Sequence, residues 1–531
     1  MGLENNKIVK RFLNVGEKKG GSSTMGIFVG AFAAFGGVLY GYDTGTISGI
    51  LAMKYVVKEF AANHTEFTSS EKSLIVSILS AGTFFGAVLA PLLSDTLGRR
   101  FTIIFASLVV FNIGIILQAA ATGIPLLCAG RAIAGLGVGL ISSCIPLYQS
   151  EATPKWIRGA VVSCYQWAIT LGLLLASLVN QGSHARNDSG SYRIPICVQF
   201  LWSLILGVGM IFLPETPRFF VSKGDNDKAK QSLSRLMKLP IDHPDLVEEH
   251  ADIKAAYDFE SHFGQSSWKQ VFSMDHRQFK RLMTSVWLQA FQQLTGVNFI
   301  FYFGTTFFES VGLNGFVSNL ATNIVNFGST IPGILLTDVI GRRKLLIGGA
   351  IGMCVSQYIV AIVGIATPTD SKAAGNVLIA FSCIFIAFFA ATWGPAAWVV
   401  TGEIFPLRTR AKSVALSAAS NWIWNWALAY ATPYMVDSGP GNGNLGVKVF
   451  FVWGSFNFLC IIFSWALIYE TKGLTLEQVD ELYELVPHAW RSPGFVPSTH
   501  AFRDDARSIG SDKANVVAEV EEVEESKEAS P

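Results

Sequence analysis

Long apolar runs, separated by short polar loops, dominate this chain. About twelve of them can cross a bilayer, because roughly 20 residues at about 1.5 Å rise per residue span the hydrocarbon core. The pattern therefore predicts an all-α membrane protein with twelve transmembrane helices. We expect these helices near residues 26–51, 73–94, 101–121, 125–148, 160–180, 194–213, 281–311, 317–338, 344–366, 375–402, 412–435 and 446–468.

A polar segment with helical-looking pieces divides the spans into two sets of six. We expect an N-terminal cytoplasmic segment at 1–25, a bundle at 26–213, a linker at 214–280, a second bundle at 281–470 and a tail at 471–531. The first residues are polar and lysine-rich, which argues against a cleavable signal peptide. The tail ends in an acidic run, which is either a solvated disordered end or a regulatory segment.

Composition supports a membrane protein and excludes several other classes. Half of the residues are hydrophobic and 15% are charged, and the mean hydropathy is +0.40. The net charge of +1 gives no reason to expect a nucleic-acid partner. The seven cysteines lie in apolar stretches without a metal-ligand pattern, so we expect buried thiols and neither a metal nor a disulfide. The chain has no P-loop and no GxSxG motif, so we predict neither an enzyme nor a cofactor.

Basic residues gather in the loops on one side of the predicted bundles. The rule that positive loops stay in the cytoplasm places this side and both termini inside. The glycosylation acceptors Asn63 and Asn187 fall on the opposite, outward side, although such short motifs also arise by chance.

The two halves repeat three charged signatures in the same order. Asp95-x-x-Gly-Arg-Arg after the second span matches Asp338-x-x-Gly-Arg-Arg after the eighth. Glu151-x-x-Pro after the fourth span matches Glu403-x-x-Pro after the tenth. Glu215-Thr after the sixth span matches Glu470-Thr after the twelfth. Two repeated six-helix halves indicate a rocking transporter that holds its substrate between them.

The repeated charges lie at the cytoplasmic helix ends, where acid–arginine pairs can form and break as that face closes and opens. The alternative is that they serve only as orientation signals and anchors. The predicted gating residues are Asp95, Arg99, Glu151, Arg158, Glu215, Arg218, Asp338, Arg342, Glu403, Arg410 and Glu470.

Several motifs together resemble the sugar porter family of the major facilitator superfamily, over about residues 26 to 480. They include Gly41-Tyr-Asp-Thr-Gly45, Gly130-Arg-x-x-x-Gly135, Pro146-x-Tyr-x-x-Glu151, Pro214-Glu-Thr-Pro-Arg218, Gln292-Gln-Leu-Thr-Gly-x-Asn298, Gly394-Pro-x-x-Trp398 and Asn421-Trp-x-x-Asn425. The stretch around Asp43 resembles fungal monosaccharide transporters in particular. The resemblance implies two six-helix bundles with a cytoplasmic helical linker.

A hexose needs amides that both donate and accept hydrogen bonds, together with aromatic surfaces. The seventh span carries Gln292, Gln293 and Asn298, with Phe301 and Tyr302 beside them, and its glycine at 296 favours a broken helix. The alternative is that these amides only join helices. The resemblance adds five candidates from other spans: Gln166, Asn326, Trp398, Trp422 and Asn425.

Asp43 is a carboxylate within the first span, and intramembrane ionisable residues are candidates for function. The resemblance implies that Asp43 and Arg131 form a proton-coupling site. Burial favours the neutral carboxyl group and Arg131 favours the anion, so a conformational change can switch its protonation. A structural salt bridge is the alternative.

The resemblance therefore implies a plasma-membrane importer of D-glucose and related monosaccharides that acts as a monomer in the lipid bilayer, with protons as the coupling ion. Three alternatives stay open: a uniporter for hexose, a carrier of another cargo such as a pentose, polyol, quinate or disaccharide, and a non-transporting glucose sensor. The tail of about sixty residues favours a transporter, because sensors of this type tend to have long cytoplasmic tails.

Overall fold

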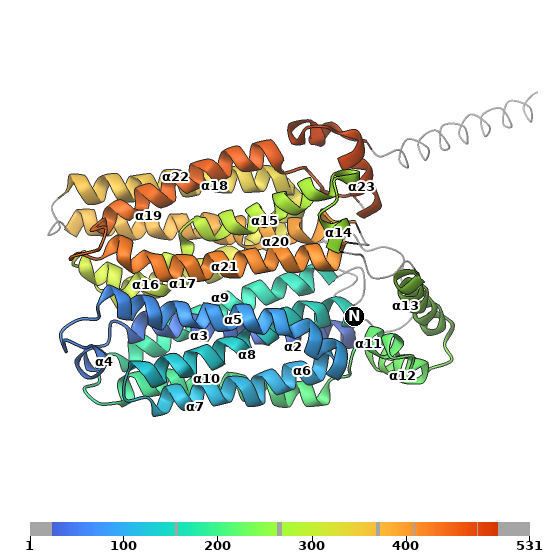
Figure 1. Cartoon of the computed structure of the whole chain (residues 1–531), viewed down its shortest axis with the longest axis horizontal. Coiled ribbons are helices and arrows are strands. Elements are labelled where there is room, and N and C mark those ends of the chain that lie inside the picture. The colour runs from blue at the N-terminus through green and yellow to red at the C-terminus, as the bar shows by residue number, and fades with distance from the viewer. Residues whose placement is uncertain are drawn as a thin grey trace, which may run out of the picture.

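The computed structural model describes residues 24–153, 158–262, 268–367, 372–406, 409–474 and 476–496. Within these ranges every regular element is a helix. Figure 1 shows two bundles of long helices side by side, blue to teal for the N-terminal half and yellow to orange for the C-terminal half. The predicted all-helical architecture is confirmed.

The N-terminal bundle contains one helix or broken helix for each of the first six expected spans. Two spans are interrupted, the first near Ala34 and the third by the π-helix η2. The elements are α2 Thr24–Ala33, α3 Phe35–Ile50, α4 Lys54–Phe60, α5 Ser69–Leu97, α6 Arg99–Phe105, η2 Ala106–Phe111, α7 Asn112–Ala120, α8 Ile124–Ala152, α9 Arg158–Ser183 and α10 Gly190–Phe212.

The C-terminal bundle follows the same plan. Its first and fourth spans are broken into α15 with α16 and α19 with α20. The elements are α15 Gln278–Leu294, α16 Val297–Ser310, α17 Gly315–Ile340, α18 Arg342–Ala366, α19 Lys372–Ala391, α20 Trp393–Glu403, α21 Arg410–Val436, the 3₁₀ turn η4 Gly446–Lys448 and α22 Val449–Leu467.

Shorter helices gather at one end of the two bundles, which we call the linker end (Figure 1). The opposite end, where α4 lies, is called the far end. The short helices are α11 Pro217–Ser222, α12 Asn226–Met237, α13 Pro244–His262, α14 Trp268–Val271, η3 Asp275–Arg277, α23 Leu476–Leu485 and η5 Ala489–Gly494.

Polar and apolar side chains are distributed as a bilayer requires. Large apolar side chains such as Phe85, Leu92 and Phe212 point outward, with exposed fractions of 60%, 66% and 79%. Asp43 and Arg131 are buried in the interior. Charged groups inside a membrane protein face the bundle interior because lipid cannot solvate them.

Nine helices among the described residues are long and apolar enough to cross a membrane by length and composition. The other expected spans are α15 with α16, α17 and α21. The break at Gly296 leaves α15 and α16 only 17 and 14 residues long, whereas polar residues such as Asn326 in α17 and Asn425 in α21 lower the mean hydropathy of those two helices. The seven cysteines are free; four are buried and two, Cys164 and Cys383, are half-buried, but Cys197 is exposed on α10, so the expectation of a buried thiol is wrong for this residue. It falls on an outward helix face, which a run of apolar neighbours does not reveal.

Local sequence explains where individual helices begin. Thr68 and Glu71 form a capping box at the start of α5, in which the Thr68 hydroxyl accepts from the Glu71 N–H at 3.3 Å and Glu71 accepts from the Thr68 N–H at 2.8 Å. This arrangement satisfies two N–H groups that a helix start leaves without partners. Asn314 caps α17 in a related way, since its side chain accepts from the Val317 N–H at 3.1 Å.

Candidate functional site

The broken seventh span places two of its three candidate amides close together. Gly296 has φ +82°, in the left-handed region, and separates α15 from α16. The Asn298 amide beyond the break donates to the Gln293 side chain before it. Glycine suits this position because it adopts positive φ without steric cost. The predicted break is confirmed, and it brings Gln293 and Asn298 together.

Gln292 faces a different set of partners from Gln293. Its side-chain N–H₂ donates to the carbonyls of Trp393 and Gly394 in α20, at 3.0 and 3.1 Å. Its carbonyl accepts from Asn421 in α21 at 2.8 Å. Gln292 therefore joins three helices of the C-terminal half in this conformation.

Asn425 in α21 is the centre of a second polar cluster. Its Oδ1 accepts from Tyr302 at 3.0 Å and from Ser80 of the N-terminal half at 2.6 Å. Its Nδ2 donates to Gln293 at 3.2 Å. Two candidates from α15 and α16 thus meet a third from α21 at the interface between the halves.

The remaining sugar-site candidates lie on five helices. Gln166 in α9 comes from the N-terminal half, and a Cβ placed on Gly394 would lie 4.0 Å from its Nε2. Trp422 is buried and packs edge-on against Tyr40 of α3, with ring centroids 5.7 Å apart. Phe301 in α16 and Asn326 in α17 are buried, whereas Trp398 in α20 is 38% exposed.

A small cavity adjoins this cluster. Gln293, Asn298 and Tyr302 line it together with Trp453 of α22, and its volume is about 10 Å³. That is room for about one water molecule. A hexose in contact with these amides therefore requires the helices around them to rearrange.

The coupling candidates Asp43 and Arg131 are both buried, with exposed fractions of 0% and 1%. They lie near enough for electrostatic interaction. Arg131 donates from Nε to the carbonyl of Ile75 in α5 at 2.7 Å. Neither carboxyl oxygen of Asp43 accepts a hydrogen bond from the described residues. Burial disfavours the Asp43 anion and the nearby Arg131 charge favours it, so the two effects oppose each other.

Sequence reasoning missed two neighbours of this pair. Gln199 of α10 is 1% exposed and lies beside the Asp43 carboxyl. A glutamine within an otherwise apolar span is the signal that would have singled it out. Tyr40 lies one helical turn before Asp43 and contacts Trp422 of the other half. An aromatic residue in an apolar run carries no comparable signal.

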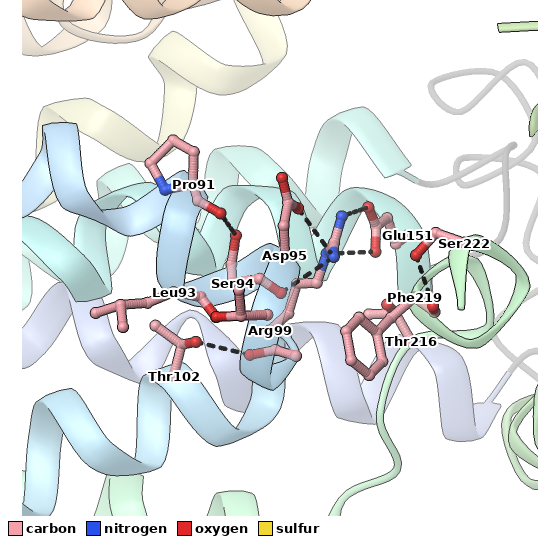
Figure 2. A network of polar contacts seen from close by, with 12 residues as sticks. Pro91, Leu93, Ser94, Asp95, Arg99, Thr102, Glu151, Thr216, Phe219 and Ser222 are labelled. Carbon is pink, nitrogen blue, oxygen red and sulfur yellow. Dashed lines mark hydrogen bonds and ion pairs between the residues drawn. The ribbon is translucent and has the colours of Figure 1, made fainter. Parts of the chain in front are cut away.

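Three of the predicted gating residues of the N-terminal half, Asp95, Arg99 and Glu151, form a compact network at the linker end (Figure 2). Arg99 forms ion pairs with Asp95 and with Glu151, each at 3.3 Å. The Glu215 carboxylate accepts from the Arg100 N–H at 3.0 Å. Burial raises the pKa of Glu215 above its usual value, although the N–H groups of Thr216 and Arg100 oppose that rise.

The C-terminal half repeats this geometry. Arg342 pairs with Glu403 at 2.9 Å, and the Arg342 N–H donates to Glu470 at 2.9 Å. Gly98 and Gly341 have φ of +99° and +98°, and a Cβ on either would collide with the carboxylate of Glu215 or Glu470. The glycine in each signature is therefore required by its backbone conformation and by the adjoining carboxylate.

Four further gating candidates are placed less completely. Arg218 lies in the first turn of α11 and Arg410 begins α21. The side chains of Arg158 and Asp338 lie outside the described residues. The described contacts of Arg99 and Arg342 join helices of the same half, so their role in closing the linker end stays a prediction.

The glycosylation candidates Asn63 and Asn187 are both exposed. Asn63 follows α4 at the far end, and its side chain accepts from the N–H groups of Thr65 and Glu66. Asn187 lies in the loop between α9 and α10. Modification at either site stays a prediction.

A polar network that sequence reasoning missed joins the two halves nearer the far end. Ser48 of α3 contacts Thr305 of α16 at 3.0 Å and accepts from Asn319 of α17 at 2.9 Å. Asn323 of α17 donates to Ser177 of α9 at 2.7 Å. All five residues are buried. The asparagines at 319, 323 and 326 follow helical spacing, which is a signal that the sequence offered.

An ion pair lies beyond this network at the far end. Lys72 of α5 pairs with Asp437, which follows α21, at 2.9 Å. Ser69 donates to the same carboxylate at 3.0 Å, and Ser73 donates to the Tyr430 carbonyl at 2.7 Å. Together with the buried network, these contacts hold the two halves together on this side.

Comparisons with known proteins agree with this architecture. The family described as "Sugar (and other) transporter" matches residues 29–483. A solved structure of the proton:xylose symporter XylE from E. coli, bound to 6-bromo-6-deoxy-D-glucose, superimposes with a TM-score of 0.72 at 26% identity, over 87% of this chain and 100% of that one.

Three curated relatives are more similar in sequence. The major facilitator-type transporter ecdD of Aspergillus rugulosus is 53% identical over 91% of both chains. The high glucose sensor RGT2 of Saccharomyces cerevisiae is 48% identical over 88% of this chain, which spans 62% of the sensor's length. The probable glucose transporter rco-3 of Neurospora crassa is 48% identical over 90% of this chain and 82% of that protein. This chain therefore belongs to the sugar transporter family of the major facilitator superfamily, as a multi-pass membrane carrier and not an enzyme.

Proposed function

We propose that this chain imports glucose and related hexoses across the plasma membrane by alternating access, as a monomeric proton symporter. The observation that carries the proposal is the amide and aromatic cluster where the halves meet. Gln293, Tyr302 and Asn425 of one half converge there with Ser80 of the other. A site built from both halves can exchange its contacts as the halves rock.

Glucose as cargo is supported by the resemblance to a probable glucose transporter and by the chemistry of the cluster. Amides both donate to and accept from ring hydroxyls, and Trp422 with Tyr40 supplies aromatic surface nearby. The basic residues at the linker end, including Arg99 and Arg342, support a cytoplasmic location for that end and for both termini.

Proton coupling is supported by the surroundings of Asp43. This carboxyl group is buried, accepts no hydrogen bond from the described residues and has Arg131 and Gln199 as buried neighbours. A carboxyl group in such surroundings can exchange a proton when the halves move. A symporter that carries one charge gains about 2.3 kcal/mol per 100 mV, enough for roughly 50-fold accumulation.

A glucose sensor is the second candidate, because the chain is 48% identical to a protein named as one. A sensor on this fold would bind sugar without moving it. Flux distinguishes the two functions directly.

The test is uptake of labelled glucose in cells that lack their own hexose uptake. We expect accumulation above the outside concentration that is lost with a protonophore and with Asp43→Asn. Asp227→Asn, in linker helix α12, removes a carboxylate away from the site and should leave accumulation unchanged. If glucose only reaches the outside concentration, and neither the protonophore nor Asp43→Asn changes its uptake, the chain is a uniporter. Sugar binding without uptake, in protein present at the cell surface, would favour the sensor.

A further inference from the structure

The segment that follows the last span is docked onto the C-terminal bundle at the linker end. Tyr483 of α23 packs on Tyr469, with ring centroids 4.3 Å apart, and Trp490 stacks on Trp465 at 5.0 Å. The Glu470 N–H donates to the Ser492 hydroxyl at 2.8 Å. Residues 476–494 are thus part of the folded carrier, although the sequence led us to group them with a polar tail.

One buried arginine connects this segment to the seventh span. Arg281 lies in the first turn of α15, and its side chain is 0% exposed. It forms an ion pair with Asp480 of α23, its guanidinium lies 4.5 Å over the Tyr483 ring, and it donates to the Ile404 carbonyl after α20 at 3.4 Å. Asp480 is the partner that compensates the charge of this buried arginine.

Arg281 also begins a row of contacts between α15 and α20. Ser285 and Gln289 lie 3.1 and 3.0 Å from the Thr401 hydroxyl, and Gln292 donates to the Trp393 and Gly394 carbonyls. Positions 281, 285, 289 and 292 share one helix face. The row therefore sets the register of α15 against α20, from the linker end to the candidate sugar site about 16 Å away.

We propose that Asp480 is a positioning residue for sugar binding. It holds Arg281, and Arg281 keeps the linker end of α15 in register with α20. Gln292 then ties the other end of α15 to α20, and Gln293 beside it keeps the orientation in which it meets the sugar. The inference rests on the proposed function, in which Gln293 contacts the sugar.

The test compares two substitutions that each remove one carboxylate from α23 of the full-length carrier. Asp480→Asn breaks the pair with Arg281, whereas Glu484→Gln alters a residue on the exposed face of the same helix. We expect Asp480→Asn to raise the KM for glucose by between about 2-fold and 30-fold, with little change for Glu484→Gln. We also expect faster hydrogen exchange at residues 278–294 in the purified Asp480→Asn protein alone.

A double variant, Arg281→Met with Asp480→Leu, distinguishes the positioning effect from the destabilisation caused by leaving the buried Arg281 charge without its ion-pair partner. It leaves no unpaired charge, so it should fold even where Asp480→Asn does not. If positioning is correct, its KM and its exchange at 278–294 stay raised. The proposal is overturned if the double variant matches the wild type, or if Glu484→Gln has the same effect as Asp480→Asn.

The hydrogen-exchange arm keeps this inference separate from the proposed function. If the wild type transports no sugar, the proposed function fails in the uptake assay. Faster exchange in Asp480→Asn would still support the tie between α23 and α15, and unchanged exchange would overturn it.

Discussion

Gln292 and Gln293 are neighbours in α15 with different surroundings. The Gln292 amide forms hydrogen bonds with Trp393, Gly394 and Asn421 within one half. Gln293 contacts Asn298 and Asn425 and lines a small cavity. The first residue therefore fits the helix-joining alternative in this conformation, and the second lies where a ligand can reach it.

We expect the two alanine variants to separate these roles. Gln292→Ala leaves the Asn421 amide and two α20 carbonyls short of partners, at a cost of about 1–3 kcal/mol, so it should lower the melting temperature of the purified protein. Gln293→Ala should mainly raise the KM for glucose, by roughly 5-fold or more for one lost hydrogen bond. Thr330→Val, which removes a hydroxyl bonded within its own helix, serves as the control. The reverse assignment of effects would contradict this reading.

The buried network of Ser48, Ser177, Thr305, Asn319 and Asn323 crosses between α3 and α9 on one side and α16 and α17 on the other. Opening the far end must separate these groups and give them water as a partner. The network therefore favours the conformation in which the far end is closed.

Two adjacent threonines of α16 allow this role to be tested. Thr305 contacts Ser48 and Asn319, whereas Thr306 donates to the Phe303 carbonyl of its own helix. Thr305→Val should shift the equilibrium toward an open far end by several-fold, because one lost hydrogen bond costs about 1 kcal/mol, and Thr306→Val should not. The measurement is the rate at which an impermeant thiol reagent, added outside, labels Asn326→Cys in each background. Equal rates in the two backgrounds would exclude the proposed role of the network.

At the linker end each half contains the same kind of buried arginine–glutamate ion pair. In each half, a buried arginine pairs with the glutamate at the end of a span, Arg99 with Glu151 and Arg342 with Glu403. Rocking of two rigid bundles needs each half to keep its own shape, and these pairs tie helix ends within a half.

The two carboxylates that form ion pairs with Arg99 differ in burial, so substituting each in turn tests whether burial matters. The side chain of Glu151 is 5% exposed and that of Asp95 is 69% exposed. Glu151→Gln removes a buried partner, a loss of about 3–5 kcal/mol for such pairs, and should strongly reduce the maximal uptake rate per carrier at the surface. Asp95→Asn breaks an exposed pair worth about 0–1 kcal/mol and should change that rate little. Equal losses in both variants would contradict a role that depends on burial.

The sequence alone was enough to predict the helical membrane fold, the two repeated halves and the break in the seventh span. The length of an apolar run indicates a membrane helix directly, because the thickness of the bilayer sets how many apolar residues a spanning helix needs. Glycines within the motifs indicate positions where the backbone adopts a positive φ, as it does at Gly98, Gly341 and Gly296. These features depend on residues near one another in the chain.

Tertiary structure decided which polar groups meet across the bundle. The pairing of Arg281 with Asp480 joins positions 199 residues apart, and Ser48 with Thr305 joins positions 257 apart. Serine, threonine and asparagine in an apolar run do not reveal whether they bond their own helix, as Thr306 does, or a partner across the halves, as Thr305 does. That distinction depends on how each helix is rotated against its neighbours, and only the packing of the complete bundle sets the rotation.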